Sequence, residues 1–165
     1  MKNWNAIYVA SRQEKKVDEA LKQKGIESYL PLVKTLRQWS DRKKMVEFPL
    51  LPGYVFVRPD ENEKNNVLQI RGVVNYVRHN GQIGVVYENE IEGLRQLIGL
   101  GYHLEAFPES RQIKKGDKIK ITSGVLKNLE GWVIEDAENS FFEVLLEGIG
   151  YNVRTKLPRG ILLKE

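Results

Sequence analysis

The stretch that decides the fold is Phe48-Pro-Leu-Leu-Pro-Gly-Tyr-Val-Phe-Val57. Two strand-like segments meet in it at Pro52-Gly53, a dipeptide that interrupts strands and favours a turn. Because side chains alternate between the two faces of a strand, Tyr54 and Phe56 face one side and the valines between them face the other. We therefore expect a sheet with one aromatic face and one aliphatic face.

A second strand with the same division is expected at residues 4–10. There Trp4 and Tyr8 point one way, whereas the isoleucine and valine next to Tyr8 point the other way. The helices expected nearby carry aliphatic stripes that suit the isoleucine and valine face, so no element is assigned to cover Tyr8, Tyr54 and Phe56. An uncovered aromatic patch is a candidate docking site, and burial of the rings in the core is the alternative.

Strand and helix signals alternate along the first hundred residues. Ser11-Arg-Gln-Glu14 has the pattern of a capping box, which predicts a helix that ends at Gly25. Asp60 can cap a short helix, and Asn80-Gly81 predicts a β-hairpin. Extended segments are expected at 28–37, 45–50, 53–58 and 73–78, a polar basic loop at 38–44 and a helix at 88–101. This order predicts an α+β fold, a sandwich of an antiparallel sheet with helices on one face.

The character of the sequence changes beyond residue 103. Residues 104–112 show no periodicity and contain Pro108, which is typical of a linker. Five short strands separated by glycines are expected after it, at 118–122, 131–135, 141–147, 151–157 and 160–163. So many short strands in so few residues predict a small, strongly curved β-barrel. We therefore expect an N-terminal domain over 1–103, a linker over 104–112 and a barrel domain over 113–165.

The positive charge of the chain is concentrated at its N-terminal end. All 165 residues together have a formal net charge of +4, but the first 45 residues hold 11 basic and 5 acidic side chains, a net charge of +6. Such clustering indicates either a nucleic-acid-binding surface or an ordinary solvated helix face beside a charged loop.

Several function classes are excluded by what the sequence lacks. It has no cysteine, so disulfides, cysteine-ligated metals and thiol catalysis are ruled out. His79 and His103 lie outside any catalytic or metal-binding motif, and no nucleotide-binding glycine loop is present. We therefore expect no enzyme activity, cofactor or metal. Since no signal peptide or membrane-length apolar run occurs, we expect a cytoplasmic protein that does not contact the membrane.

Several motifs in combination resemble the NusG family of bacterial transcription elongation factors. Residues 49–57 fit the family's P-x-x-P-G-Y-[VLI]-F-V segment, and Trp4-x-x-x-Tyr8 fits its opening. Residues 70–77, Ile-Arg-Gly-Val-Val-Asn-Tyr-Val, resemble a further family stretch in shortened form. Residues 116–133 resemble a KOW motif, in which Gly131 corresponds to a glycine in a turn that a side chain would block. The resemblance covers nearly the whole chain, with both domains in the right order.

This resemblance implies a factor that binds RNA polymerase and suppresses pausing or termination. In the family, a hydrophobic pocket of the N-terminal domain receives the clamp helices of the largest polymerase subunit. The matching residues here are Tyr8, Leu51, Tyr54 and Phe56, with Pro52 and Gly53 shaping the turn. Aromatic anchors of this kind dominate binding energy in protein interfaces. The barrel of family members tethers other machinery, such as a ribosomal protein or a termination factor.

Specialised members of the family, RfaH and the UpxY-like antiterminators of polysaccharide operons, also read the exposed non-template DNA strand. Their reading surface involves the first helix and the Arg-Gly turn, positions that here hold Lys15, Lys16, Lys22 and Arg71. Leu51, where a phenylalanine is more typical, favours such a specialised, operon-specific paralogue. Phosphate contacts by these cations would add salt-dependent affinity.

The strand expected at 141–147 has two apolar faces. Phe142, Val144 and Leu146 share one face, and Phe141 and Leu145 share the other. If the first set fills the barrel, Phe141 and Leu145 are exposed to a partner or to the first domain. A β-bulge would reverse these roles.

A different reading of the central strand remains open. Residues 53–57 also resemble the central strand of an RNA-recognition motif, in which aromatic side chains on the sheet stack on bases. Pro52 and Pro59 depart from that pattern where a basic residue and a third aromatic residue belong. The alternative function is therefore an RNA-recognition-like or ribosome-associated KOW protein that binds RNA.

Overall fold

The computed structural model describes residues 2–99, 104–108, 117–120, 130–135, 140–146 and 150–156. The chain divides into two compact units, Met1–Val85 and Val86–Glu165. The boundary between them precedes the helix that we expected at the end of the first domain, so this helix groups with the second unit.

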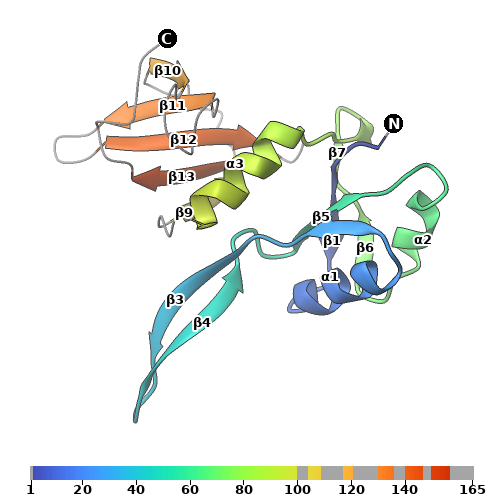
Figure 1. Ribbon diagram of the computed structural model, residues 1–165, viewed down its shortest axis with the longest axis horizontal. Coiled ribbons are helices and arrows are strands. Elements are labelled where there is room, and N and C mark those ends of the chain that lie inside the picture. The colour runs from blue at the N-terminus through green and yellow to red at the C-terminus, as the bar shows by residue number, and fades with distance from the viewer. Residues whose placement is uncertain are drawn as a thin grey trace. The chain divides into compact units, whose positions relative to one another are not determined.

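The first unit is built on a four-stranded antiparallel sheet with the strand order β2-β5-β1-β6 (Figure 1). Its strands are β1 (Asn5–Val9), β2 (Glu27–Tyr29), β5 (Tyr54–Arg58) and β6 (Val73–Tyr76). In the central pair, Ile7 lies opposite Val55 and Tyr8 lies opposite Tyr54. The expected division into an aliphatic and an aromatic face is therefore confirmed in the pairing of β1 and β5.

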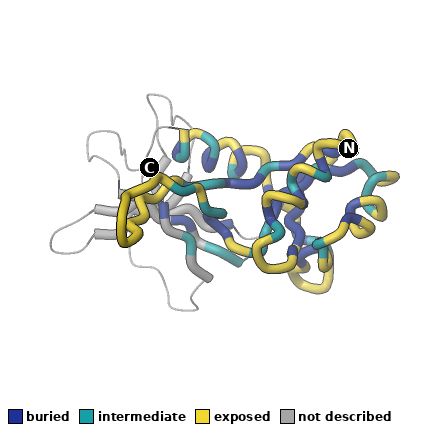
Figure 2. The backbone as a smooth tube through the Cα atoms, turned by 90° about the horizontal axis from the view of Figure 1, so that it is seen from below, coloured by how far each residue is buried: buried dark blue, intermediate teal, exposed yellow. Residues whose placement is uncertain are grey.

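A hydrophobic core fills the aliphatic side of this sheet. Two helices, α1 (Glu14–Gln23) and α2 (Lys64–Leu68), contribute to it. The buried side chains of the cluster come from the strands, the helices and the segments between them: Ile7, Val9, Val17, Leu21, Ile26, Leu30, Val55, Val57, Val67, Ile70 and Tyr76. Figure 2 shows this inside as dark blue stretches of the backbone. Packing of the valine and isoleucine face against aliphatic helix side chains is thus confirmed for α1 and α2.

The start of α1 differs from the expected capping box. Its N-cap is Gln13 and makes no side-chain capping bond. The reason lies one residue earlier, where Arg12 adopts a left-handed backbone with φ of 63° and the chain turns before the helix begins. Ser11 is displaced from the capping position by this turn, and the carboxylate of Glu14 binds the backbone of another segment, the turn before β5.

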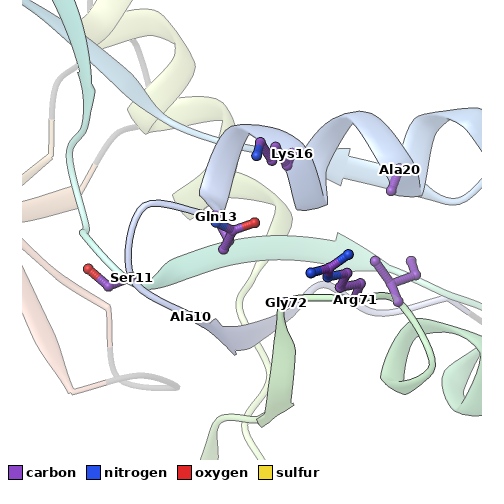
Figure 3. A pocket seen from close by; sticks show the side chains of 8 residues that line it. Ala10, Ser11, Gln13, Lys16, Ala20, Arg71 and Gly72 are labelled. Carbon is purple, nitrogen blue, oxygen red and sulfur yellow. The ribbon is translucent and has the colours of Figure 1, made fainter.

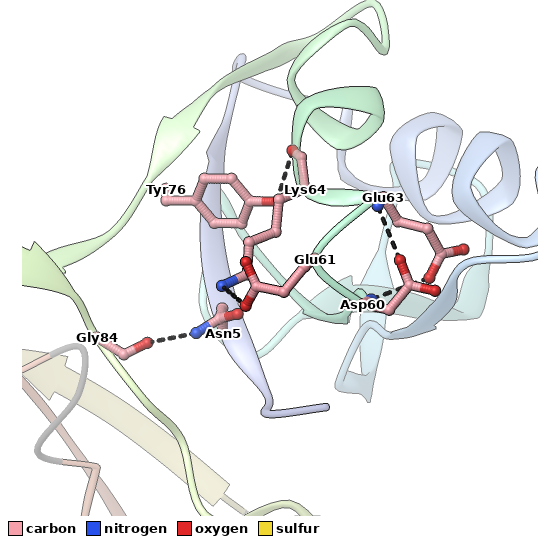
Figure 4. A network of polar contacts seen from close by, with 7 residues as sticks. All are labelled: Asn5, Asp60, Glu61, Glu63, Lys64, Tyr76 and Gly84. Carbon is pink, nitrogen blue, oxygen red and sulfur yellow. Dashed lines mark hydrogen bonds and ion pairs between the residues drawn. The ribbon is translucent and has the colours of Figure 1, made fainter. Parts of the chain in front are cut away.

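A reciprocal pair of hydrogen bonds closes the turn before α2. The Asp60 carboxylate accepts a bond from the Glu63 backbone N–H at 2.9 Å, and the Glu63 carboxylate accepts one from the Asp60 N–H at 3.0 Å (Figure 4). The N-cap of α2 is Glu63, which makes no side-chain capping bond, so Asp60 closes the turn before the helix and does not, as we had expected, cap the helix itself. In the same region the Tyr76 hydroxyl donates to the Lys64 carbonyl at 2.9 Å, which ties β6 to α2.

Two hairpins complete the first unit. Strands β3 (Leu32–Gln38) and β4 (Lys43–Pro49) pair with each other over their whole length and extend as an arm from the sheet (Figure 1). The polar loop expected at 38–44 is therefore shorter, because its ends belong to these strands. Strands β7 (Arg78–His79) and β8 (Gln82–Ile83) meet at Asn80-Gly81, whose φ values of 53° and 79° suit a tight hairpin turn, as predicted.

The second unit contains helix α3 (Glu88–Gly99) and a five-stranded antiparallel sheet with the order β10-β11-β12-β13-β9. Its strands are β9 (Leu104–Pro108), β10 (Asp117–Lys120), β11 (Glu130–Glu135), β12 (Ser140–Leu146) and β13 (Tyr151–Lys156). Strand β9 occupies the first half of the expected linker, because its backbone pairs with β13. The strand expected at 160–163 lies outside the described residues, and closure of the sheet into a barrel stays a prediction.

Candidate functional site

Two tyrosines form the exposed part of the aromatic face. The rings of Tyr8 and Tyr54 lie on neighbouring strands with their centroids 5.1 Å apart and their planes tilted by 48°. Tyr8 is 40% exposed and Tyr54 is half-buried. This tilted arrangement is favourable for aromatic pairs and leaves part of both rings available on the surface.

The turn before β5 is fixed by three hydrogen bonds, one within the turn, one to strand β1 and one to helix α1. The Tyr54 N–H donates to the Leu51 carbonyl at 3.1 Å, which closes a β-turn with proline and glycine at its centre. Gly53 has φ of 86°, which the second central position of a type II turn requires. Its carbonyl accepts a bond from the Val9 N–H at 2.9 Å. Its N–H donates to the buried Glu14 carboxylate at 3.1 Å.

The capping residue that the sequence suggested therefore has another role. Glu14 ties helix α1 to the proline–glycine turn across 39 positions of sequence. Periodicity and local motifs cannot reveal such a contact, because it depends on the packing of α1 beside β5.

Phe56 and Leu51 do not belong to the exposed face. Their exposed fractions are 0% and 1%, so the alternative of core burial is correct for Phe56, and Leu51 of the expected pocket is buried as well. Phe56 stacks on Tyr29 of β2, with ring centroids 6.3 Å apart, and lies opposite the small side chain of Ala6. We expected an uncovered face, but alternation along a strand specifies only the side on which a ring lies and not what packs over it.

A second candidate site is a pocket of about 650 Å³ at the N-terminus of α1 (Figure 3). It brings together two of the four predicted nucleic-acid-binding residues, Lys16 and Arg71. The other lining residues are Ala10, Ser11, Gln13, Ala20, Ile70 and Gly72. Cations, a hydroxyl and an amide beside short apolar side chains are groups that can hold a phosphate and contact a base.

Gly72 is the residue that lets the two sides of this pocket meet. Its φ is 99°, and its carbonyl accepts a bond from the Ala10 N–H at 2.7 Å. A Cβ atom at this position would lie 3.0 Å from Val17 Cγ2 and 3.3 Å from Gln13 Cβ. The glycine thus allows the Arg71-Gly72 turn to lie directly against α1. The sequence indicated a role for this turn, but it assigned Ser11 to helix capping and gave no signal for Gln13 as a pocket residue.

The other two lysines point away from the pocket. The Lys15 ammonium donates to the Glu47 carbonyl at 3.2 Å, at the arm formed by β3 and β4. The Lys22 ammonium pairs with Asp18 at 2.6 Å, one turn back along the exposed side of α1. From their spacing on the helix we expected the three lysines to form one cluster. In the structure Lys16 lines the pocket, whereas Lys15 and Lys22 have partners elsewhere.

The predicted residues of the second unit are described only in part. Gly131 lies in strand β11 opposite Ile119, not in a turn, because β10 and β11 pair at this position. Leu146 and Val153 are buried, and Val153 lies opposite Val144. The side chains of Phe141 and Leu145 lie outside the described part of the structure, so their exposure stays a prediction.

One titratable group of the first unit is strongly shifted. Burial raises the pKa of the Tyr76 hydroxyl to about 12 from the ordinary value of 10.0. The group lies against α2 and outside both candidate sites, so it has a structural role. Among the described residues, no three acidic or histidine side chains gather in a way that could hold a metal ion. No helix in that part of the chain has the length and apolar character needed to span a membrane.

Comparisons with known proteins show to which family this mixed α/β fold with an antiparallel sheet belongs. The family model NusG, described as transcription termination factor nusG, matches residues 2–95. This match covers more than half of the sequence, and the chain belongs to the NusG family. Members of this family are transcription factors without enzymatic activity, and the homology points to transcription elongation.

Two solved structures are reported beside the family model, and the first of them agrees with it. A structure described as domain interaction in Thermotoga maritima NusG is 26% identical, with a TM-score of 0.54, and the match covers 99% of this chain and 97% of that one. A structure of an MjSpt4:Spt5 complex is 20% identical, with a TM-score of 0.31, over 98% of this chain and 97% of that one. None of the curated proteins matches the chain.

Proposed function

We propose that this protein is a transcription elongation and antitermination factor that binds RNA polymerase through Tyr8 and Tyr54. The observation that carries the proposal is the partly exposed tyrosine pair beside a turn that is held by Glu14 and Val9. A rigid aromatic pair loses little conformational freedom on binding, which favours affinity. The partner would be the clamp helices of the largest polymerase subunit. Leu51 and Phe56 are buried and would support this surface from below.

Membership of the NusG family supports the choice of partner. The same proposal assigns the pocket at α1 to the non-template DNA strand, with Lys16 and Arg71 contacting phosphates, as in an operon-specific RfaH- or UpxY-like paralogue. The second unit would act as a KOW barrel that tethers a ribosomal protein or a termination factor.

The test of polymerase binding is a double substitution, Tyr8→Ala with Tyr54→Ala, in the full chain. We expect loss of co-purification with core RNA polymerase while circular dichroism stays unchanged. Tyr87→Ala is the control, because Tyr87 is 61% exposed and belongs to the second unit of the chain. Co-purification of the double variant at the wild-type level would contradict the proposal.

The test of the pocket is Lys16→Gln with Arg71→Gln. We expect weaker crosslinking to the non-template strand of a paused elongation complex, with polymerase binding through the tyrosines retained. Lys24→Gln with Arg78→Gln removes the same charge from exposed positions outside the pocket. Equal crosslinking by the two double variants would contradict this assignment.

The RNA-binding alternative makes a separate prediction. It requires Tyr54 and Phe56 to stack on bases, but Phe56 is buried. A gel-shift experiment with the full chain and short RNA separates the two functions, because only the alternative expects tight binding that Tyr54→Ala abolishes.

A further inference from the structure

The arm formed by β3 and β4 exposes apolar side chains near its tip. Leu36 and Met45 lie opposite each other on one face of the arm, and each is 55% exposed. Trp39, in the connection between the strands, is 47% exposed. A two-stranded ribbon gains no stability by leaving such groups in water, so their position indicates a surface that contacts a partner.

The same arm carries an excess of positive charge. Residues 32–49 include five basic and two acidic side chains, a net charge of +3. The basic residues are Lys34, Arg37, Arg42, Lys43 and Lys44. Glu47 pairs with Lys34 at 3.9 Å, near the base of the arm. The tip therefore has Asp41 as its one acidic side chain.

One cross-strand pair is unfavourable for the isolated protein. Arg37 lies directly opposite Lys44, and like charges in this position destabilise a β-hairpin. The Arg37 guanidinium lies 4.4 Å from the centre of the Phe48 ring, and this cation–π contact holds it in place. The residue opposite Arg37 on the neighbouring strand is a lysine and not an acidic residue. An anionic ligand would relieve the repulsion between these two side chains.

The base of the arm is fixed, so the tip is presented in a defined direction from the first unit. The Leu50 N–H donates to the Pro31 carbonyl at 2.9 Å, just beyond the last strand pair. Helix α1 adds the bond from Lys15 to the Glu47 carbonyl. The first bond extends the pairing of the two strands, the second joins the arm to α1, and Leu32 at the base packs against the core of the first unit.

We propose that the β3–β4 arm is a ribbon that binds duplex DNA in the major groove. A B-form major groove is about 12 Å wide and admits a two-stranded β-ribbon. Arg42, Lys43 and Lys44 would contact phosphates, while Leu36 and Met45 would contact base edges and thymine methyl groups. The major groove of duplex RNA is too narrow and deep for this arrangement, so the arm selects DNA. This inference does not depend on the tyrosine surface.

The test uses the full chain and a fluorescently labelled, blunt-ended DNA duplex about two helical turns long. The variant Arg42→Gln with Lys43→Gln and Lys44→Gln should weaken binding about tenfold or more at low salt. It should also reduce the slope of log affinity against log salt by about 0.9 for each phosphate that the arm no longer neutralises. The matched control, Lys2→Gln with Lys24→Gln and Arg78→Gln, removes the same charge outside the arm and should retain the wild-type slope.

A second variant tests the apolar face independently of charge. Leu36→Ser with Met45→Ser should weaken duplex binding without changing the salt slope. Both side chains are largely in water, so folding should be retained, as checked by circular dichroism. Wild-type duplex affinity and salt slope in the charge variant would overturn the proposal. Tighter binding to duplex RNA of the same length would overturn it as well, and so would a charge variant that loses as much affinity for single-stranded DNA, which we assign to the pocket at α1, as for the duplex.

Discussion

The sheet with the tyrosine pair and the β3–β4 arm are both β-structures of the first unit, but they are stabilised differently. Strands β1 and β5 have a buried aliphatic core behind them, and the turn before β5 is held by Glu14 and Val9. The arm consists of two strands that pair only with each other, and its outer half is exposed. A binding surface on the sheet is therefore preorganised by the core, whereas a binding surface on the arm depends on local pairing.

The largest expected contrast concerns apolar side chains of similar size. Phe56→Ala should lower the free energy of unfolding by about 3–5 kcal/mol, because it leaves a cavity in a fully buried site. Met45→Ala should change it by less than about 0.5 kcal/mol, since Met45 is largely in water. Urea denaturation of both variants measures the contrast, and similar losses would show that the arm is part of the stabilising core.

The next contrast compares two glycines at positive φ, of which only one has close neighbours, so it separates the effect of steric crowding from that of backbone strain. Gly72→Ala and Gly81→Ala both place an alanine at positive φ, but only Gly72 has atoms within 3.0–3.3 Å of the added Cβ. We expect Gly72→Ala to be more destabilising than Gly81→Ala by about 1–3 kcal/mol. The comparison is made by thermal and urea denaturation. Equal losses would mean that Val17 and Gln13 move aside without cost.

A smaller effect is expected for the contact between α1 and the turn. Glu14→Ala leaves the Gly53 N–H without its acceptor and should cost about 1–2 kcal/mol. Glu14→Gln retains an oxygen acceptor and should recover most of the loss. Hydrogen exchange at the Gly53 amide is the direct measurement. Unchanged protection in the alanine variant would mean that the turn does not need α1.

The last effect is absent at neutral pH, because it is a pH dependence that arises from one buried tyrosine of the sheet. The pKa of Tyr76 is raised from 10.0 to about 12 in the folded state, so the folded protein keeps a proton that the unfolded chain loses. Stability should therefore fall as the pH rises above 10 toward 12. Tyr76→Phe should remove this part of the pH dependence, as measured by denaturation at successive pH values. A profile unchanged by the substitution would assign the effect to other groups.

The sequence predicted local alternation and turns well, and packing less well. The division of Tyr54 and Val55 between two faces follows from strand geometry, and so does the hairpin turn at Asn80-Gly81. Burial of Phe56 depends on the rest of the fold, so alternation could not predict it. The pairing of β3 with β4 had no signal beyond two extended segments. The division of Lys15 and Lys16 between two surfaces likewise needed the position of Glu47 in space.

The independence of the arm from the core has a consequence for how its length can change. Because side chains repeat every two residues along a strand, removing or adding two residues in each strand keeps both faces of the ribbon in place. Each such step changes the reach of the tip by roughly 6.6 Å, at about 3.3 Å per residue. The base at Pro31 and Leu50 would be untouched, and so would the sheet behind it. The arm can thus act as an adjustable spacer between the body of the first unit and whatever its tip touches.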